Sequence, residues 1–161
     1  MPAMIRAMFH VILFQPEIPP NTGNLIRLCA NAGATLHLVH PLAFDLSDAH
    51  VRRAGLDYHE MASVREHADL AACLAAVEPP RLFALTTRAT RCLYDATFTA
   101  GDAFLFGPET RGLPSELLAT IEPQLRLRIP MRSGNRSLNL SNAVAVPAYE
   151  AQRQWRFSSQ H

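Results

Sequence analysis

The sequence contains no lysine: all 15 basic residues are arginine, and 14 acidic residues leave a formal net charge of +1. A charge this close to zero argues against a protein that holds nucleic acid by bulk electrostatics. Arginine nevertheless suits phosphate better than lysine does, because its planar guanidinium can donate two hydrogen bonds to one phosphate group. Several arginines fall in or beside expected loops: Arg27, Arg52, Arg53, Arg88, Arg91, Arg111, Arg132 and Arg136. The exclusive use of arginine therefore has two explanations: a local basic surface, or a bias of genome base composition.

Cysteine and long hydrophobic runs are also scarce. The three cysteines are odd in number and share no CxxC spacing, so neither a disulfide framework nor a zinc site is supported. No apolar stretch approaches the ~20 residues that cross a bilayer, and residues 1–8 are too short for the apolar core of a signal peptide. We therefore expect a cytoplasmic protein with no membrane segment. With 161 residues and 48% hydrophobic content, one domain over 1–161 is expected.

Several catalytic motifs are absent. GPETRG (107–112) has the glycine spacing of a P-loop, but Leu113 and Pro114 stand where Lys and Ser/Thr would bind phosphate and magnesium. No GxGxxG or GxSxG occurs, and the seven histidines show neither HExxH nor any paired spacing. These absences argue against a nucleotide triphosphatase, a dinucleotide enzyme, acyl transfer and metal catalysis. No metal is expected.

The hydrophobic pattern predicts strands that alternate with helices, which is typical of a mainly parallel α/β sheet. The strands are expected at 8–14, 35–40, 81–86, 102–107 and 125–130. Helices are expected at 21–34, 48–54, 64–77, 114–121 and from about 139. Asn21, after two prolines, is predicted to cap the first helix. Pro147 lies inside the last helix, where a proline removes a hydrogen bond and puts the straightness of the helix in doubt.

The polar residues collect in the connections that follow the strands, at 15–24, 86–90, 107–114 and 129–139. In open parallel sheets, ligands bind outside the carboxyl ends of the strands, where these connections meet. The connections offer backbone amides, hydroxyls and carboxamides, and glycines such as Gly107, Gly112 and Gly134 permit close approach. Such groups suit an adenosine-type cofactor better than a triphosphate.

Three of these stretches also carry a family resemblance. NTGNLIR (21–27), LFGPETRGLP (105–114) and IPMRSGNRSLNLSNAVAV (129–146) resemble, in order and spacing, the three motifs of the SPOUT superfamily of RNA methyltransferases, in its ribose 2'-O-methylating branch. LFQPEIPPNTGN (13–24) and RRAGLDYHE (52–60) resemble the small subfamily that methylates the wobble nucleotide of tRNA. The resemblance extends over nearly the whole chain, from about residue 8 to 155.

The resemblance implies a parallel-sheet α/β fold in which the C-terminal region, about 81–155, forms a deep trefoil knot. Its loops would hold S-adenosylmethionine in a bent form and release S-adenosylhomocysteine. By this resemblance, backbone amides at Ile129 bind the adenine, Gly107 lies against the ribose and Leu85 ends a strand under the cofactor. Ser137 and Asn139 close the pocket and face the methyl group, although both could be plain turn residues.

The resemblance also implies the catalytic residues Arg27, Asn21, Glu109, Ser137 and Asn139. Arg27 matches the residue next to the reacting hydroxyl; because arginine stays protonated, clamping phosphate and polarising the hydroxyl is preferred to base catalysis. Its alternative is a solvated helix-face arginine. Glu109 could accept a proton, pair with Arg27, or form a structural ion pair with Arg111.

The expected partners are a tRNA anticodon stem-loop and a second copy of the chain. The expected reaction is methylation of the 2'-hydroxyl of a cytidine or uridine at wobble position 34. One alternative is a SPOUT methyltransferase that acts on ribosomal RNA, and another is a non-catalytic RNA-binding or assembly module. The homodimer is predicted because 138–149 is almost entirely apolar or small, so that a helix there needs cover on more than the side facing the sheet.

Overall fold

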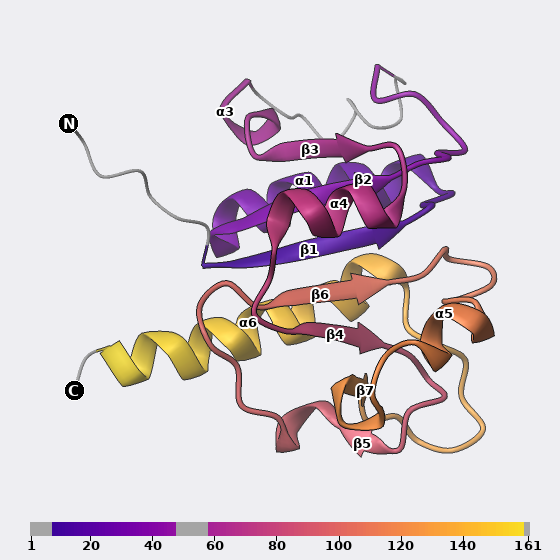
Figure 1. Cartoon of the computed structure of the whole chain (residues 1–161), viewed down its shortest axis with the longest axis vertical. Helices are drawn as coiled ribbons and strands as arrows, with labels where there is room; N and C mark the ends of the chain where they lie inside the picture. The colour runs from indigo at the N-terminus through magenta and orange to yellow at the C-terminus, as the bar shows by residue number, and fades with distance from the viewer. Residues whose placement is uncertain (1–7, 48–57, 160–161) are drawn as a thin grey trace.

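The computed structural model describes residues 8–47 and 58–159, and its strands form one seven-stranded sheet in the order β3-β2-β1-β6-β4-β7-β5 (Figure 1). All of the pairings are parallel, which confirms the predicted sheet class. The strands are β1 (Phe9–Phe14), β2 (Ala34–Val39), β3 (Val64–His67), β4 (Leu82–Leu85), β5 (Arg91–Cys92), β6 (Ala103–Phe106) and β7 (Arg126–Arg128). The helix expected at 48–54, with Arg52 and Arg53, lies outside the described residues.

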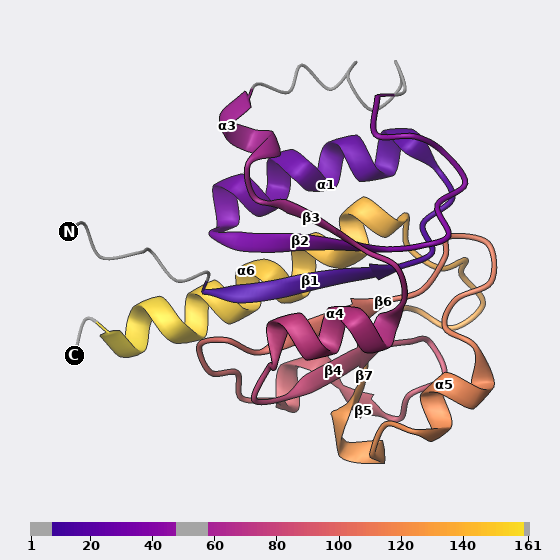
Figure 2. The same cartoon turned by 45° about the horizontal axis from the view of Figure 1, so that its top comes forward.

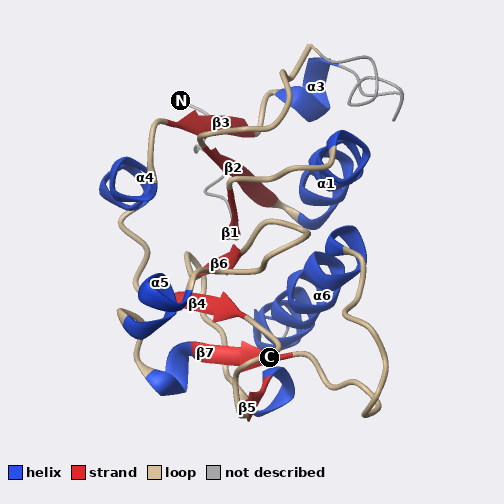
Figure 3. Cartoon of the chain, turned by 90° about the vertical axis from the view of Figure 1, so that its right-hand side faces the viewer, coloured by secondary structure: helices blue, strands red, loops and turns tan. Residues whose placement is uncertain are grey.

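Helices cover both faces of this sheet (Figure 3). They are α1 (Pro19–Ala32), α3 (Tyr58–Met61), α4 (Leu70–Val77), α5 (Ser115–Ala119) and α6 (Leu140–Ser159), with 3-10 turns at Leu93–Asp95 and Pro123–Leu125. Helices α1 and α6 pack on one face, and α4 and α5 lie on the other. Successive residues of β1 alternate between the two cores: Val11 and Leu13 belong to the first, and Ile12 to the second.

The strand order places the polar connections together. From β1 the chain adds β2 and β3 on one side and then crosses to β4 on the other, and β6 later fills the place between β1 and β4. Because the strands are parallel, the connections that follow β1, β4, β6 and β7 reach the same edge of the sheet, at the right in Figures 1 and 2. The order therefore reverses beside β1, which is where ligands bind in such sheets.

The start of α1 differs from the sequence prediction. The N-cap is Ile18, with Pro19 and Pro20 in the first turn, and Asn21 is a buried residue of that turn. Proline is favoured at the first helical position because its fixed φ suits the helix and its missing N–H would have no helical partner there. The prediction that Asn21 caps this helix is therefore wrong, and its side chain is available for another contact.

The helix predicted over 64–77 is also partly wrong. Residues Val64–His67 form β3, which pairs in parallel with β2, and the helix begins only at Leu70. Asp69 caps it, since its carboxylate accepts a hydrogen bond of 2.7 Å from the amide of Ala72. The pattern misled because an edge strand with polar residues lacks the apolar run of a buried strand.

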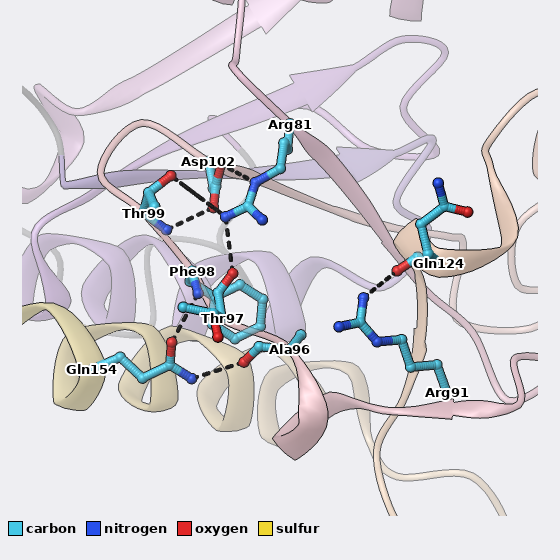
Figure 4. A network of polar contacts seen from close by, with 9 residues as sticks. All are labelled: Arg81, Arg91, Ala96, Thr97, Phe98, Thr99, Asp102, Gln124 and Gln154. Atoms are coloured by element: carbon cyan, nitrogen blue, oxygen red, sulfur yellow. Dashed lines mark hydrogen bonds and ion pairs between the residues drawn. The ribbon is translucent and has the colours of Figure 1, made fainter.

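Helix α6 continues through Pro147, which is buried. Its second half is attached to the segment that follows β5 (Figure 4). The side-chain amide of Gln154 donates to the carbonyl of Ala96 at 3.0 Å and accepts from the amide of Phe98 at 2.8 Å. The same segment is held at the sheet by Arg81, whose guanidinium donates to the carbonyl of Thr97 at 2.9 Å and pairs with the buried Asp102 at 2.6 Å. No helix of the described chain is long and apolar enough to cross a membrane.

Candidate cofactor site

A cavity of about 260 Å³ lies at the carboxyl ends of β4, β6 and β7. Small-molecule sites usually measure about 300–1,000 Å³, so this cavity is close to the lower end of that range. Its walls come from 85–88, 106–113, Ile129, Met131, Ser137, Leu138, Leu140 and Ala143. These are the connections in which the sequence concentrates its polar residues.

The four residues predicted to bind the cofactor all line this cavity. Leu85 ends β4, Gly107 follows β6, Ile129 follows β7 and Ser137 precedes α6. They come from four places in the sequence and meet because three neighbouring parallel strands end together. Their location agrees with the predicted binding role, and the role itself stays a prediction.

The chemistry of the walls suits an uncharged ring and a ribose. Phe106, Leu113 and Leu140 add apolar surface, while Thr86 and Thr110 bring hydroxyl groups that donate and accept hydrogen bonds. Arg88 is also in the wall, but its guanidinium donates to the carbonyl of Leu113 and, at 2.8 Å, to the hydroxyl of Ser115. Arg88 therefore braces the loop after β6.

Packing within the protein requires glycine at position 107, in addition to the close approach of a ligand that the sequence predicts there. A Cβ atom at this position would lie 2.3 Å from the carbonyl carbon of Gly112 and from the amide nitrogen of Leu113. Gly112 itself has φ +68°, in the left-handed region that glycine tolerates. The loop after β6 thus turns back against its own start, and only glycine fits at Gly107.

Two carboxylates fasten this loop to the start of α1. Glu109 accepts hydrogen bonds from the amides of Glu17 at 2.7 Å and Ile18 at 3.2 Å. In return, Glu17 accepts from the amide of Thr110 at 3.0 Å and from its hydroxyl at 2.7 Å. These two Thr110 hydrogen bonds, the hydroxyl's first, lower the pKa of Glu17, and the charge of Arg111 adds to them. We call this arrangement the Glu17–Glu109 clamp.

The sequence did not single out Glu17, although a carboxylate just before a proline-led helix start was the available signal. For Glu109, the clamp replaces the pairing with Arg27 or Arg111 that the sequence left open. Its position in the cavity wall is consistent with the predicted site, but its contacts are those of a residue that positions the loop.

Asn21 and Asn139 contact each other. The side-chain amide of Asn139 donates to the Oδ1 of Asn21 at 3.1 Å, and its own Oδ1 accepts from the amide of Ser141 at 2.9 Å. The pair joins the first turn of α1 to the segment that enters α6. The described residues that line the cavity include Ser137 but neither Asn21 nor Asn139.

Arg27 lies further along α1, and its side chain is 47% exposed. Its guanidinium pairs with Glu60 of α3 at 3.3 Å. Arg27 is likewise not among the described residues of the cavity wall. The structure thus brings together Leu85, Gly107, Glu109, Ile129 and Ser137 and leaves Arg27 on a separate, exposed surface.

A doubly covered parallel sheet with a small cavity of amides, hydroxyls and apolar side chains at its carboxyl edge defines an α/β protein of the class in which such a cavity suits a nucleoside-like cofactor. The chain matches the SpoU rRNA Methylase family over residues 8–149 and belongs to that family. It is therefore a methyltransferase, and the predicted SPOUT membership is confirmed.

Three similar proteins carry further information. A tRNA (cytidine(34)-2'-O)-methyltransferase of Burkholderia ambifaria is 59% identical over 152 residues, which cover 93% of this chain and 97% of the relative. A structure described as "Structural insights into the 2-OH methylation of C/U34 on tRNA" has a TM-score of 0.83 and 50% identity, with 92% of this chain and 96% of that chain covered. The SpoU methyltransferase AviRb from Streptomyces viridochromogenes, in complex with AdoMet, has a TM-score of 0.81 and 26% identity, with 95% of this chain and 59% of that chain covered.

Proposed function

We propose that the chain transfers a methyl group from S-adenosylmethionine to the 2'-hydroxyl of the ribose at position 34 of tRNA, where the base is cytidine or uridine. The observation that carries this proposal is the 59% identity, over nearly the full length of both chains, to a tRNA (cytidine(34)-2'-O)-methyltransferase. Because this highly similar relative is a tRNA methyltransferase, the ribosomal RNA alternative is not favoured.

The cofactor supplies an electrophilic methyl group on its sulfonium. For this chain we assign adenine binding to the backbone at Ile129, the ribose contact to Gly107 and apolar support to Leu85. Ser137 is assigned to the methyl side of the cavity, with Asn139 holding the segment beside it through Asn21. The donor set supports this assignment, since it is rich in amides and hydroxyls and has apolar walls. Much of the catalysis is then positioning.

Arg27 is assigned to the RNA. A guanidinium stays protonated at any physiological pH, so it clamps phosphate and polarises the ribose hydroxyl and does not act as a base. Arg27 is not among the described residues that line the cavity of its own chain. We therefore propose that it acts at the cofactor cavity of a second copy of the protein. The exposed side chains of Leu138 (42%) and Tyr149 (44%), on and beside α6, support a homodimer.

The remaining family traits follow from the same proposal. We assign the chain one domain over 1–161 with a trefoil knot in about 81–155, and a cytoplasmic location beside its tRNA substrate. The anticodon stem-loop is the expected binding partner, because single-stranded loops expose 2'-hydroxyls and splayed bases. With few arginines near the site, binding to RNA should weaken with salt by a slope of roughly 0.7 per phosphate contact.

The test offers three substrates with labelled S-adenosylmethionine: whole tRNA, the same tRNA with deoxyribose at position 34, and ribosomal RNA fragments. We expect label only in the first, on the ribose of nucleotide 34. Label on a base, or preferential label on ribosomal RNA, would overturn the assignment of the substrate. RNA binding with no label in any substrate would favour the non-catalytic module.

A further inference from the structure

Three histidines on neighbouring strands form a continuous row far along the sheet from the cofactor cavity. His10 lies on β1, His37 on β2 and His67 at the end of β3. The Nε2 of His37 is 3.0 Å from the Nδ1 of His10, and its Nδ1 is 2.9 Å from the Nε2 of His67. His37 is only 4% exposed.

Cys73 of α4 completes the cluster from the helix that packs beside β2 and β3. Its thiol is fully buried, and its Sγ and one ring nitrogen each of His37 and His67 lie within 4.8 Å of one another. Within the described chain, this is a group of imidazole and thiol ligands drawn from three different elements. Such ligands are those that zinc prefers in proteins.

We propose that His37, His67 and Cys73 bind one Zn²⁺ ion, with a water molecule as the fourth ligand. Tetrahedral zinc with Zn–N of about 2.0 Å and Zn–S of about 2.3 Å places its ligand atoms roughly 3.3–3.6 Å apart. The Nδ1 of His37 and the Nε2 of His67 are 2.9 Å apart, and the ligand atoms all lie within 4.8 Å of one another, so small side-chain shifts reach this geometry. His67, which is only half-buried, has room to adjust and offers the route by which the ion and water enter.

The surroundings of the ligands are those of a metal site. Burial, followed by the nearby His10, lowers the pKa of His37 to about 3, and burial also lowers the pKa of His67. Both rings are therefore neutral near pH 7, which is the form that binds a metal. His10 is positioned to hold the second ring nitrogen of His37, as outer hydrogen-bond partners do for metal-bound imidazoles.

Binding requires one proton to leave. Burial raises the pKa of the Cys73 thiol to about 11, so this thiol is protonated in the metal-free protein. A bound zinc ion deprotonates a coordinating thiol; the S–H bond breaks, its electron pair forms the S–Zn bond, and the proton passes to solvent. Each imidazole keeps its single proton on the ring nitrogen that faces away from the ion.

The site joins α4 to the outer strands β2 and β3, so its role is to stabilise this half of the fold. It takes no part in methyl transfer, because the cofactor cavity lies at β4, β6 and β7. No sequence motif predicts this site, since 30 residues separate the two histidines and the cysteine comes from a helix. The sequence predicts no metal anywhere in the protein, so the proposed zinc site departs from that expectation, although it leaves the cofactor cavity without one.

The test is titration of chelator-treated full-length protein with Co²⁺, whose bond to a thiolate gives a charge-transfer absorption in the near ultraviolet. We expect one equivalent to bind with this absorption, and Zn²⁺ to displace it and raise the melting temperature. Cys73→Ala should lose the absorption, while Cys92→Ala, which changes a cysteine outside the cluster, should keep it.

A second pair of variants keeps the test decisive if Cys73→Ala does not fold. His67→Gln should weaken Co²⁺ binding at least tenfold, whereas His40→Gln, which removes an exposed histidine paired with Glu66, should leave it unchanged. The proposal is overturned if wild-type protein binds no Co²⁺, or if His67→Gln and His40→Gln bind it equally well.

Discussion

Arg27 is exposed enough that its substitution should change methyl transfer without changing the stability of the fold. Its side chain is half exposed, and its ion pair with Glu60 is of a kind worth about 0–1 kcal/mol. We therefore expect the free energy of unfolding of Arg27→Ala to lie within about 1 kcal/mol of the wild-type value. The variant should keep its affinity for S-adenosylmethionine. Methyl transfer to tRNA should fall by two orders of magnitude or more, as measured with labelled cofactor.

The control for this change is Arg65→Ala. Arg65 is also an exposed arginine, on the edge strand β3, where its guanidinium donates to the carbonyls of Ala62 and Val64. It lies away from α6 and is not among the described residues of the cavity wall, so it should keep wild-type turnover. Full activity in Arg27→Ala would remove Arg27 from the mechanism, and equal losses in both variants would point to a general effect of surface charge.

Glu17 acts through the loop it holds. Glu17→Ala removes the acceptor for the amide and hydroxyl of Thr110, so the loop after β6 loses half of the Glu17–Glu109 clamp. We expect the Kd for S-adenosylmethionine to rise several-fold, measured by calorimetry, with a smaller change in turnover at saturating cofactor. Glu116→Ala, on the exposed side of α5, is the control and should bind the cofactor normally.

The pH dependence of this clamp has a definite sign. Its hydrogen bonds hold the pKa of Glu17 below the ordinary glutamate value, so the contribution of the carboxylate is full above that ordinary value. It is lost as the pH falls through the lowered pKa. Cofactor affinity of the wild type should therefore approach that of Glu17→Ala at acid pH, and a difference that persists there would contradict the clamp.

At the scale of elements, the loop after β6 depends on its first residue. In Gly107→Ala the new methyl group would meet the backbone of Gly112 and Leu113 at 2.3 Å, so the loop must open. Overpacking of this kind costs about 1–3 kcal/mol. Because the displaced loop is part of the cavity wall, cofactor affinity should fall by roughly tenfold or more, since 1.4 kcal/mol corresponds to tenfold.

Gly101→Ala separates this effect from ordinary strain. Gly101 has φ +91°, so alanine there also strains the backbone, but it packs beside Pro80, away from the cavity. We expect a lower melting temperature with unchanged cofactor affinity. If both variants lose affinity to the same extent, the close approach at Gly107 is not what shapes the site.

The elements also explain which parts of the site the sequence could predict. Leu85, Gly107 and Ile129 were predicted from the family motifs, and the structure places each of them where a buried strand ends, at the edge that parallel strands share. Asn21 was misplaced because two prolines start a helix earlier than an asparagine cap would. The strand β3 was missed because edge strands depend on pairing with a neighbour, which local hydrophobicity does not record.

Contacts between distant segments were not readable from the sequence at all. The Glu17–Glu109 clamp joins residues 92 apart, and the His37–His67 contact joins residues 30 apart. Both depend on the order in which strands pair, and no local pattern reports that order. The motifs succeeded where each stretch contributes its own short piece of the cavity wall.

At the scale of the whole molecule, the absence of Arg27 from the described cavity wall is the reason for proposing a site shared by two subunits. The proposed catalytic surfaces are the exposed side of α1 and the cavity edge, and one chain does not bring them together within its described residues. If the α1 surface of one copy faces the cavity of the other, a two-fold dimer completes both sites at once, because each contact in such an interface occurs twice. Sedimentation should therefore give a dimer at micromolar concentration.

Mixing two impaired variants, assayed at a cofactor concentration far below the Kd of Gly107→Ala, tests this arrangement directly. If Arg27 serves the partner's cavity, a heterodimer of Arg27→Ala and Gly107→Ala has one site with both defects and one site with none. After denaturation and joint refolding of equal amounts, random pairing makes half of the dimers mixed, so activity should recover to about a quarter of the wild-type value. If Arg27 instead serves its own chain, every site in the mixture carries a defect and no activity returns. Each variant refolded alone is the control, and recovery there would exclude shared sites as the cause.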